Sequence, residues 1–115
     1  MSIERKHVGP RLSKAVVHAD KVYLAGIVAD HPVPDVAAQT GQILDQIDKL
    51  LAECGSDKAK ILTANIWLAD ARYYDEMNSV WDKWVPTGNA PARACVEAKL
   101  AHPKYWVEIQ VAAVR

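Results

Sequence analysis

An arginine, a cysteine and a glutamate stand at alternate positions in the segment APARACVEAKL, residues 90–100. In a β-strand this spacing puts Arg93, Cys95 and Glu97 on one face. A planar guanidinium can bind a carboxylate through two parallel charge-assisted hydrogen bonds, so Arg93 is suited to bind a small carboxylic acid. An ion pair with Glu97 or Glu108 is its alternative role. The opposite face would lie on the core and carry the apolar residues Ala92, Ala94, Val96, Ala98 and Leu100.

The segment YWVEIQVAAV, residues 105–114, places a second carboxylate on a predicted strand. Alternation puts Glu108 on the face opposite Val107 and Ile109. A carboxylate in a partly desolvated cleft has a raised pKa, and it can take a proton from water and later return it. In one hairpin register Glu97 would lie nearly opposite Glu108 and raise one of the two pKa values further. The alternative is an outward-facing glutamate of the ordinary kind.

The two cysteines and four histidines form no catalytic or metal-binding pattern in the sequence. No histidine stands at a predictable position beside Cys95, and hydrolysis of a C=N bond needs no covalent intermediate. We therefore expect Cys95 to shape the site rather than to act as a nucleophile. Cys54 falls on an apolar helical stripe and is expected in the core. We expect no disulfide, no bound metal and no cofactor.

Length and charge restrict the classes of protein that this chain can represent. It has 115 residues, with 14 basic and 14 acidic side chains and no basic run, and half of its residues are hydrophobic. We expect one domain over residues 1–115, with its own core and no nucleic-acid partner. The charged N-terminus, MSIERKHVGP, is unlike a signal peptide or a membrane anchor. The expectation is a cytoplasmic protein with no membrane partner.

Hydrophobic periodicity predicts the elements that must position these residues. Their order is strand, strand, helix, strand, helix, strand, strand, which predicts an α+β fold with a mixed sheet and both helices on one face. The third strand would turn Leu62, Ala64, Ile66 and Leu68 to the core. In chain order the elements are strands at about 12–17 and 22–28, a helix between the N-cap Asp35 and the stop signal Gly55, a strand at 61–68, a helix ended by Pro86, and the two strands described above.

Two helices can cover only one side of such a sheet, so the other side needs a different cover. It is expected to carry apolar residues as well, namely Val17, Tyr23, Ile27 and Trp106. Another subunit is the expected cover. The row of Arg93, Cys95 and Glu97, together with Glu108, would then lie near a subunit contact, where clefts hold small ligands.

The strand motifs resemble those of a known family. The run PARACVEAKL with VEIQVAAV, the hairpin end AGIVAD and the helical segment MNSVW look like the YjgF or Rid (reactive intermediate deaminase) family, over almost the whole chain. The resemblance implies a chorismate-mutase-like homotrimer with clefts between subunits. It also implies a cofactor-free enzyme that hydrolyses 2-imino acids and their enamines to 2-oxo acids and ammonia.

Residue by residue, the resemblance implies roles for four positions. The carboxylate-binding arginine of the family falls on Arg93, its cleft cysteine on Cys95, its water-positioning glutamate on Glu108 and its helix asparagine on Asn78. On residue type alone, Asn78 could equally be an exposed helix asparagine.

Departures from the deaminase pattern suggest a divergent subgroup. Arg11 replaces a tyrosine that follows Gly-Pro, while Ala25 and Ile27 replace the serine and glutamine of an S-G-Q turn. Arg11 would add a second positive group and favour a more acidic ligand. Gly26 permits close approach of a ligand or of another backbone, or else marks a β-bulge.

One rival function belongs to a different class. A non-catalytic module of the same fold would use Arg93 to hold a small carboxylate metabolite without turning it over. A ribonuclease or an inhibitor of translation, activities attributed to parts of the family, has little support from the neutral composition.

Overall fold

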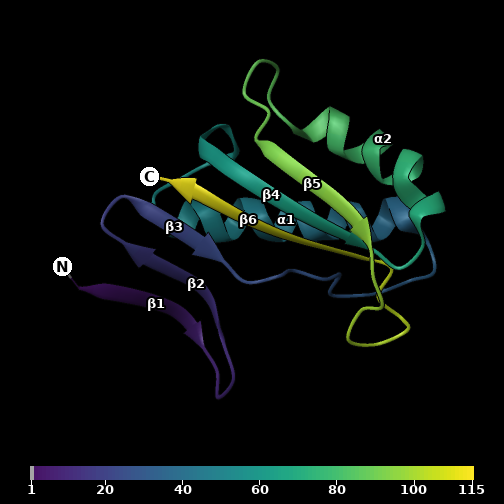
Figure 1. Ribbon diagram of the computed structural model, residues 1–115. Coiled ribbons are helices and arrows are strands. Elements are labelled where there is room, and N and C mark those ends of the chain that lie inside the picture. Colours follow the sequence, from purple (N-terminus) through teal and green to yellow (C-terminus); the bar gives the residue numbers. More distant parts are fainter. Residues whose placement is uncertain (1) are drawn as a thin grey trace.

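The computed structural model describes residues 2–115 and arranges the strands within them as one six-stranded sheet in the order β1-β2-β3-β6-β4-β5 (Figure 1). The pair β4–β5 is parallel and the other pairs are antiparallel, so the sheet is mixed. The elements are β1 (Ile3–Val8), β2 (Ser13–His18), β3 (Lys21–Leu24), α1 (Val36–Glu53), β4 (Ile61–Leu68), α2 (Tyr74–Trp84), β5 (Ala92–Glu97) and β6 (Val107–Val114).

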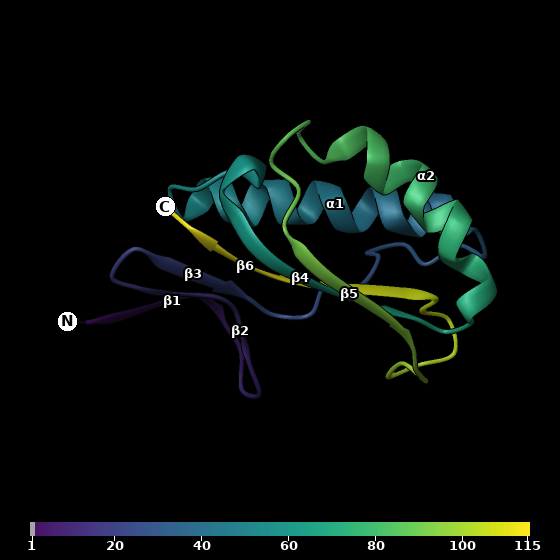
Figure 2. The ribbon, with the colours of Figure 1, turned by 45° about the horizontal axis from the view of Figure 1, so that its top comes forward.

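Helices α1 and α2 lie over the same side of the sheet, and Figure 2 shows the other side without a helix. This arrangement confirms the predicted mixed sheet with both helices on one face. We call the first side the helix-covered face; its buried residues include Leu24, Ile66 and Ile109. The second side is the open face, and it carries Tyr23 and Gln110, both exposed.

The first helix has the predicted ends. The Asp35 carboxylate accepts a hydrogen bond from the amide of Ala38 at 3.0 Å, which caps the N-terminus. Gly55 has φ of 75°, the left-handed conformation that stops many helices. Cys54, just before it, is buried in the core as predicted.

The N-terminal part of the sheet differs from the prediction. Strand β1 was not predicted, because its sequence IERKHV is polar and most of it is exposed at the sheet edge. The predicted hairpin β2–β3 is present, but β3 ends at Leu24 instead of Val28. Beyond it, Ile27 forms an isolated bridge with Ile109 of β6 and is buried.

The predicted core face of β4 needs one correction. A β-bulge between Ile61 and Thr63 breaks the alternation. Ile61 is therefore buried and Leu62, expected in the core, is 45% exposed. Ala64, Ile66 and Leu68 do face the core as predicted.

The predicted orientation of β5 is wrong. In the parallel pair, Arg93 lies beside Ala64 and Cys95 beside Ile66, so the arginine and the cysteine occupy the helix-covered face. Val96 is 54% exposed on the open face. The reason is that β5 is the edge strand beneath α2. The space between this edge and the helix is only half-buried, so a long arginine side chain can fill it.

Strands β5 and β6 do not form the predicted hairpin. Strand β4 lies between them and pairs with both. Glu97 is therefore next to Leu68, and Glu108 is opposite Trp67 on the other face of the sheet. The predicted proximity of Glu97 and Glu108 is thus wrong.

The predicted apolar content of the open face is only partly correct. Val17 and Ile27 are buried in the helix-covered core. Trp106 is half-buried and stacks on Tyr73 with ring centroids 5.2 Å apart. Tyr23 does lie on the open face and is 49% exposed.

Candidate functional site

Arg93 is held by neutral side chains of α2. Its Nη1 donates a hydrogen bond to Asn78 Oδ1 at 2.8 Å, and its Nη2 donates to the Tyr74 hydroxyl at 3.1 Å. The guanidinium carbon lies 5.2 Å from the centre of the Trp81 ring. These contacts come from residues one helical turn apart, so a single face of α2 orients the guanidinium. We call Tyr74, Asn78, Trp81, Arg93 and Cys95 the guanidinium cluster.

The positive charge of Arg93 has no acidic partner within residues 2–115. The alternative of an ion pair with Glu97 or Glu108 is therefore not found in the chain. The Glu97 carboxylate instead accepts a hydrogen bond from the amide of Ala71 at 2.8 Å, at the start of the 3-10 turn before α2. A half-buried arginine beside neutral acceptors retains free N–H groups, which makes this a site suited to an anion.

Cys95 lies next to Arg93 on the same face and packs against the core. Burial raises the pKa of the Cys95 thiol, and the nearby Arg93 charge lowers it by less. The thiol form is thus favoured, whereas a nucleophilic cysteine needs a lowered pKa.

Glu108 lies on the open face, in contact with Gly26. A β-carbon at position 26 would lie 2.1 Å from Glu108 Oε2, so only glycine leaves room for this carboxylate. Within residues 2–115 no group donates a hydrogen bond to it, and burial raises its pKa. Glu108 is thus a half-buried glutamate on the helix-free side of the sheet. The close approach at Gly26 is to this side chain, whereas a ligand or another backbone was predicted.

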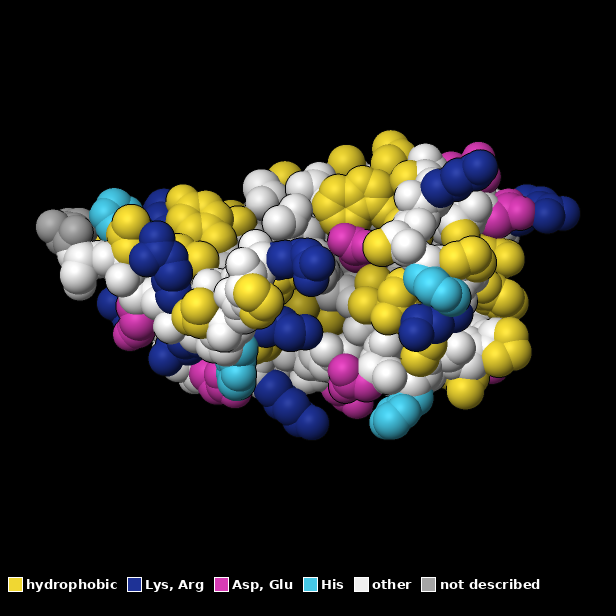
Figure 3. Space-filling model, turned by 90° about the horizontal axis from the view of Figure 1, so that it is seen from below, with side chains coloured by type: hydrophobic (Ala, Val, Ile, Leu, Met, Phe, Trp, Pro, Cys, Tyr) yellow, Lys and Arg dark blue, Asp and Glu magenta, His cyan; other side chains and the backbone are white. Residues whose placement is uncertain are grey.

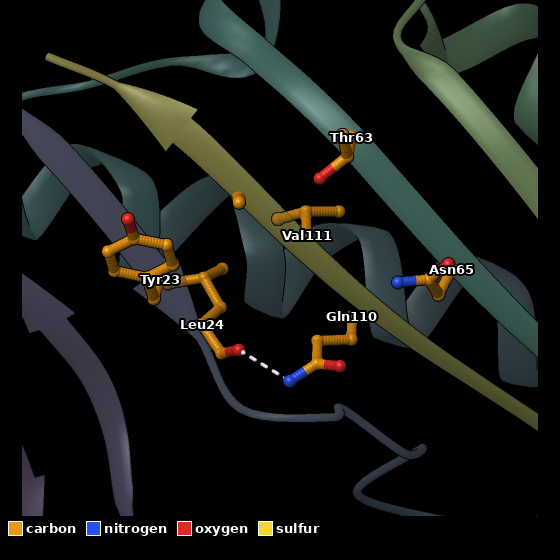
Figure 4. Close-up of a pocket in the computed structure, with 7 residues that line it drawn as sticks. Tyr23, Leu24, Thr63, Asn65, Gln110 and Val111 are labelled. Carbon is orange, nitrogen blue, oxygen red and sulfur yellow. Dashed lines mark hydrogen bonds between the residues drawn. The ribbon is translucent and has the colours of Figure 1, made fainter.

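A shallow hollow of about 210 Å³ lies on the open face, and Glu108 is not among the residues that line it. Figure 4 shows the Gln110 amide donating to the carbonyl oxygen of Leu24, at 3.3 Å. Asn65 lies opposite Gln110 on the neighbouring strand. These amides were not predicted as site groups, although their alternation with buried residues marks them as open-face groups. The lining residues are Tyr23, Leu24, Thr63, Asn65, Gln110, Val111 and Ala112.

Arg11 is exposed in the turn between β1 and β2. This turn closes through a hydrogen bond from the amide of Gly9 to the carbonyl of Leu12 at 2.8 Å. The start of β2 lies beside the segment that contains Gly26, because the amide of Ala25 donates to the carbonyl of Lys14 at 2.9 Å. In the space-filling view of Figure 3, Lys and Arg side chains stand beside exposed hydrophobic side chains around a hollow. We call Gly26 and Glu108 the carboxylate cluster.

The two clusters lie on opposite faces of the sheet. Arg93 shares the helix-covered face with Ala64, whereas Glu108 shares the open face with Trp67. The predicted row of Arg93, Cys95, Glu97 and Glu108 on one face is therefore wrong. Asn78 is hydrogen-bonded to Arg93, and Glu108 contacts Gly26. Within one chain these two pairs of residues lie apart.

Across residues 2–115, no three His, Cys, Asp or Glu side chains gather closely enough to hold a metal ion. Neither of the helices in that range has the length and apolarity needed to cross a bilayer.

Comparison with known proteins identifies the family. The model of the family described as Endoribonuclease L-PSP matches residues 5–115. A RutC family protein of Haemophilus influenzae is 46% identical over 98% of both chains, and the RutC family protein YoaB of Escherichia coli is 42% identical over 98% of both. A crystal structure of a YjgF family member from Neisseria meningitidis is 50% identical, with a TM-score of 0.97 over 100% of this chain and 96% of that one. This chain therefore belongs to the Endoribonuclease L-PSP family, the YjgF/Rid proteins that its strand motifs resemble.

Proposed function

We propose that this protein is a cofactor-free hydrolytic deaminase, which converts reactive 2-imino acids and their enamines to 2-oxo acids and ammonia. The observation that carries the proposal is the uncompensated charge of Arg93, held by Asn78 and Tyr74 with free N–H groups. A 2-imino acid has a carboxylate beside its C=N carbon, and a guanidinium binds such a group in a fixed orientation. Binding the carboxylate would hold the reacting carbon at a defined position.

The active site is proposed to form between subunits of a chorismate-mutase-like homotrimer. One chain cannot present Arg93 and Glu108 to the same ligand, because they lie on opposite faces of its sheet. A second subunit placed on the open face could bring its own Arg93, near the sheet edge, to Glu108 of the first. The exposed Tyr23 and Val96 on that face support a cover of this kind.

Glu108 is proposed to move the protons of the reaction. Its carboxylate takes a proton from water as the water oxygen bonds to the C=N carbon, which gives a neutral carbinolamine from the protonated imine. Glu108 then returns this proton to the amine nitrogen. The C–N bond breaks as the carboxylate of Glu108 takes the hydroxyl proton, which gives a 2-oxo acid and ammonia. Glu108 then passes this proton to the ammonia, which leaves as ammonium, and is a carboxylate again. The raised pKa of Glu108 brings it closer to neutral pH, where one group can accept and donate in turn.

The other proposed site residues support these two groups. Cys95 would line the cleft as a small neutral thiol, which agrees with the direction of its pKa shift. Gly26 would keep space for the carboxylate of Glu108. Arg11 would add a positive charge to the cleft.

The test is a coupled assay with 2-imino acids generated in place by an amino-acid oxidase. We expect the wild-type protein to shorten the lifetime of the imine and Glu108→Gln to lose this effect by about a hundredfold or more. Glu76→Gln, an exposed glutamate in the first turn of α2, is the matched control and should keep full activity. Full activity in Glu108→Gln would refute the assigned role.

The rival is a binding module that holds a small carboxylate without turnover. One observation favours it: the contacts that orient Arg93 are complete within one chain and do not involve Glu108. Binding of 2-oxo acids by the wild type, with no acceleration of imine loss, would establish the module in place of the enzyme.

A further inference from the structure

The guanidinium cluster contains more hydrogen-bond donors than one carboxylate can use. Two of the five N–H groups of Arg93 are bonded to Asn78 and Tyr74, which leaves three. Asn78 accepts through its oxygen, so its amide nitrogen keeps both of its N–H groups for another partner. The cluster therefore presents donors on several sides of the guanidinium and suits a ligand with more than one acceptor group.

Tyr74 supplies the donor with the most informative position. Its oxygen accepts from Arg93 Nη2, and its own O–H donates to no group within residues 2–115. The side chain is 44% exposed, so a ligand can reach the hydroxyl. A hydroxyl that accepts from a cation becomes a stronger donor, because each hydrogen bond polarises the next.

Geometry separates this hydroxyl from the carboxylate that Arg93 would bind. Acceptors on the two N–H groups of one guanidinium nitrogen lie about 5 Å apart. If a carboxylate oxygen takes the second N–H of Nη2, the Tyr74 oxygen is too far away to bond that same oxygen. It would instead reach an acceptor a few bonds further along the ligand.

We propose that Tyr74 selects ligands whose side chain carries a second acceptor, a 2-imino or 2-oxo dicarboxylic acid in the first instance. The inference rests on the proposed function, since it assumes that Arg93 binds the carboxylate beside the reacting carbon. Arg11 is a second observation in its favour. It is exposed, forms no ion pair within residues 2–115, and would bring a further positive charge to the carboxylate cluster.

The test compares two 2-oxo acids of the same chain length by calorimetry. 2-Oxopentanoate carries an apolar side chain, and 2-oxopentanedioate ends in a second carboxylate. We expect the wild-type protein to bind the diacid at least tenfold more tightly. Tyr74→Phe should weaken the binding of both acids, because its hydroxyl also helps to hold Arg93, but it should weaken the diacid by about tenfold more and so remove most of the preference. Tyr73→Phe is the matched control, because Tyr73 stacks on Trp106 and does not bond to Arg93.

The outcomes separate the inference from the function on which it rests. If Tyr74→Phe weakens both acids equally, Tyr74 only orients Arg93 and the inference fails while the carboxylate site stands. If the wild type binds the two acids equally, the inference about Tyr74 also fails, while the proposed function is unaffected. If the wild type binds neither acid, the proposed role of Arg93 fails together with it.

Discussion

Glu108 Oε2 lies directly against the α-carbon of Gly26, where a β-carbon would be 2.1 Å away. Any larger residue at position 26 must displace the carboxylate. We predict that Gly26→Ala lowers kcat/KM for imine hydrolysis by tenfold or more, because the carboxylate loses its position over the reacting carbon. Thermal unfolding should change little, since Gly26 is exposed and the glutamate side chain can rotate outward.

The control for this prediction is Gly41→Ala. Gly41 lies within α1, and a β-carbon there would meet no atom within 4 Å. This substitution should leave activity unchanged and raise stability slightly, because alanine is the better helix former. Wild-type activity in Gly26→Ala would show that the position of Glu108 is not critical.

The raised pKa of Glu108 predicts how activity and stability depend on pH. Burial raises the pKa of Glu108 above the ordinary value of 4.5, so the carboxylate form that the proposed mechanism requires predominates only at a pH above that value. We expect kcat/KM to fall on the acid side with a midpoint above pH 4.5. A midpoint at or below that value would contradict the assignment.

The free energy of unfolding should depend on the same titration of Glu108. A folded-state pKa above the unfolded one means that the folded state binds this proton more tightly. The resulting stabilisation is present below the unfolded pKa and is lost as pH rises through the folded pKa. Relative to Glu108→Gln, the wild type should thus lose stability as the pH is raised from the acid side, which chemical denaturation at a series of pH values measures.

Cys95 provides a test of the reaction class. Because burial raises its pKa, we expect Cys95→Ala to keep kcat/KM within about threefold and to cost about 1 kcal/mol of stability. Cys54→Ala is the matched comparison; Cys54 is 3% exposed, and its loss should destabilise the protein by about 1–2 kcal/mol with no effect on activity. A loss of several orders of magnitude in folded Cys95→Ala would point to covalent catalysis.

The oligomeric state tests the two-subunit site. We predict that light scattering at micromolar concentration reports three times the chain mass of 12.7 kDa. Val96→Asp, on the open face of β5, should weaken assembly because it places a charge on an exposed apolar surface. Tyr105→Phe, which adds no charge, serves as the control. A monomeric wild type with full activity would exclude a site shared between subunits.

The sequence predicted those elements whose signals are local. Helix α1 has its cap at Asp35 and its stop at Gly55, and both act within one turn of the chain. The long β4 has a clear run of apolar residues, so its bounds were predicted, but not its bulge at Leu62. A bulge depends on the pairing of β4 with β6, which is distant from it in the chain.

Strand pairing also explains what was missed in the site. The alternation of residue types correctly put Arg93 and Cys95 on one face of β5, but it cannot tell which of the two faces of the strand lies toward the helices. The parallel insertion of β5 at the sheet edge decides this, and it puts the polar residues under α2. Tyr74 and Trp81 were not identified as site residues, because their contacts with Arg93 arise only from that placement.

Arg93 combines a proposed binding role with a structural one, and the two can be separated. Its bonds to Asn78 and Tyr74 and its position over Trp81 link β5 to α2. We therefore expect Arg93→Ala to cost about 1–3 kcal/mol of stability, more than a surface arginine would. Arg93→Lys should cost less, because the lysine stem still covers Trp81 and its ammonium can still donate to a helix acceptor.

Ligand binding should respond differently from stability. An ammonium keeps the charge but lacks the planar fork, so Arg93→Lys should lose affinity for 2-oxo acids nearly as completely as Arg93→Ala, by about thirtyfold or more. Arg72→Lys is the control, because Arg72 is bonded only to Asp70 at the surface. Each variant must first be shown to have the wild-type oligomeric state. Affinity in Arg93→Lys equal to that of the wild type would remove Arg93 from the ligand site and leave it only the link between β5 and α2.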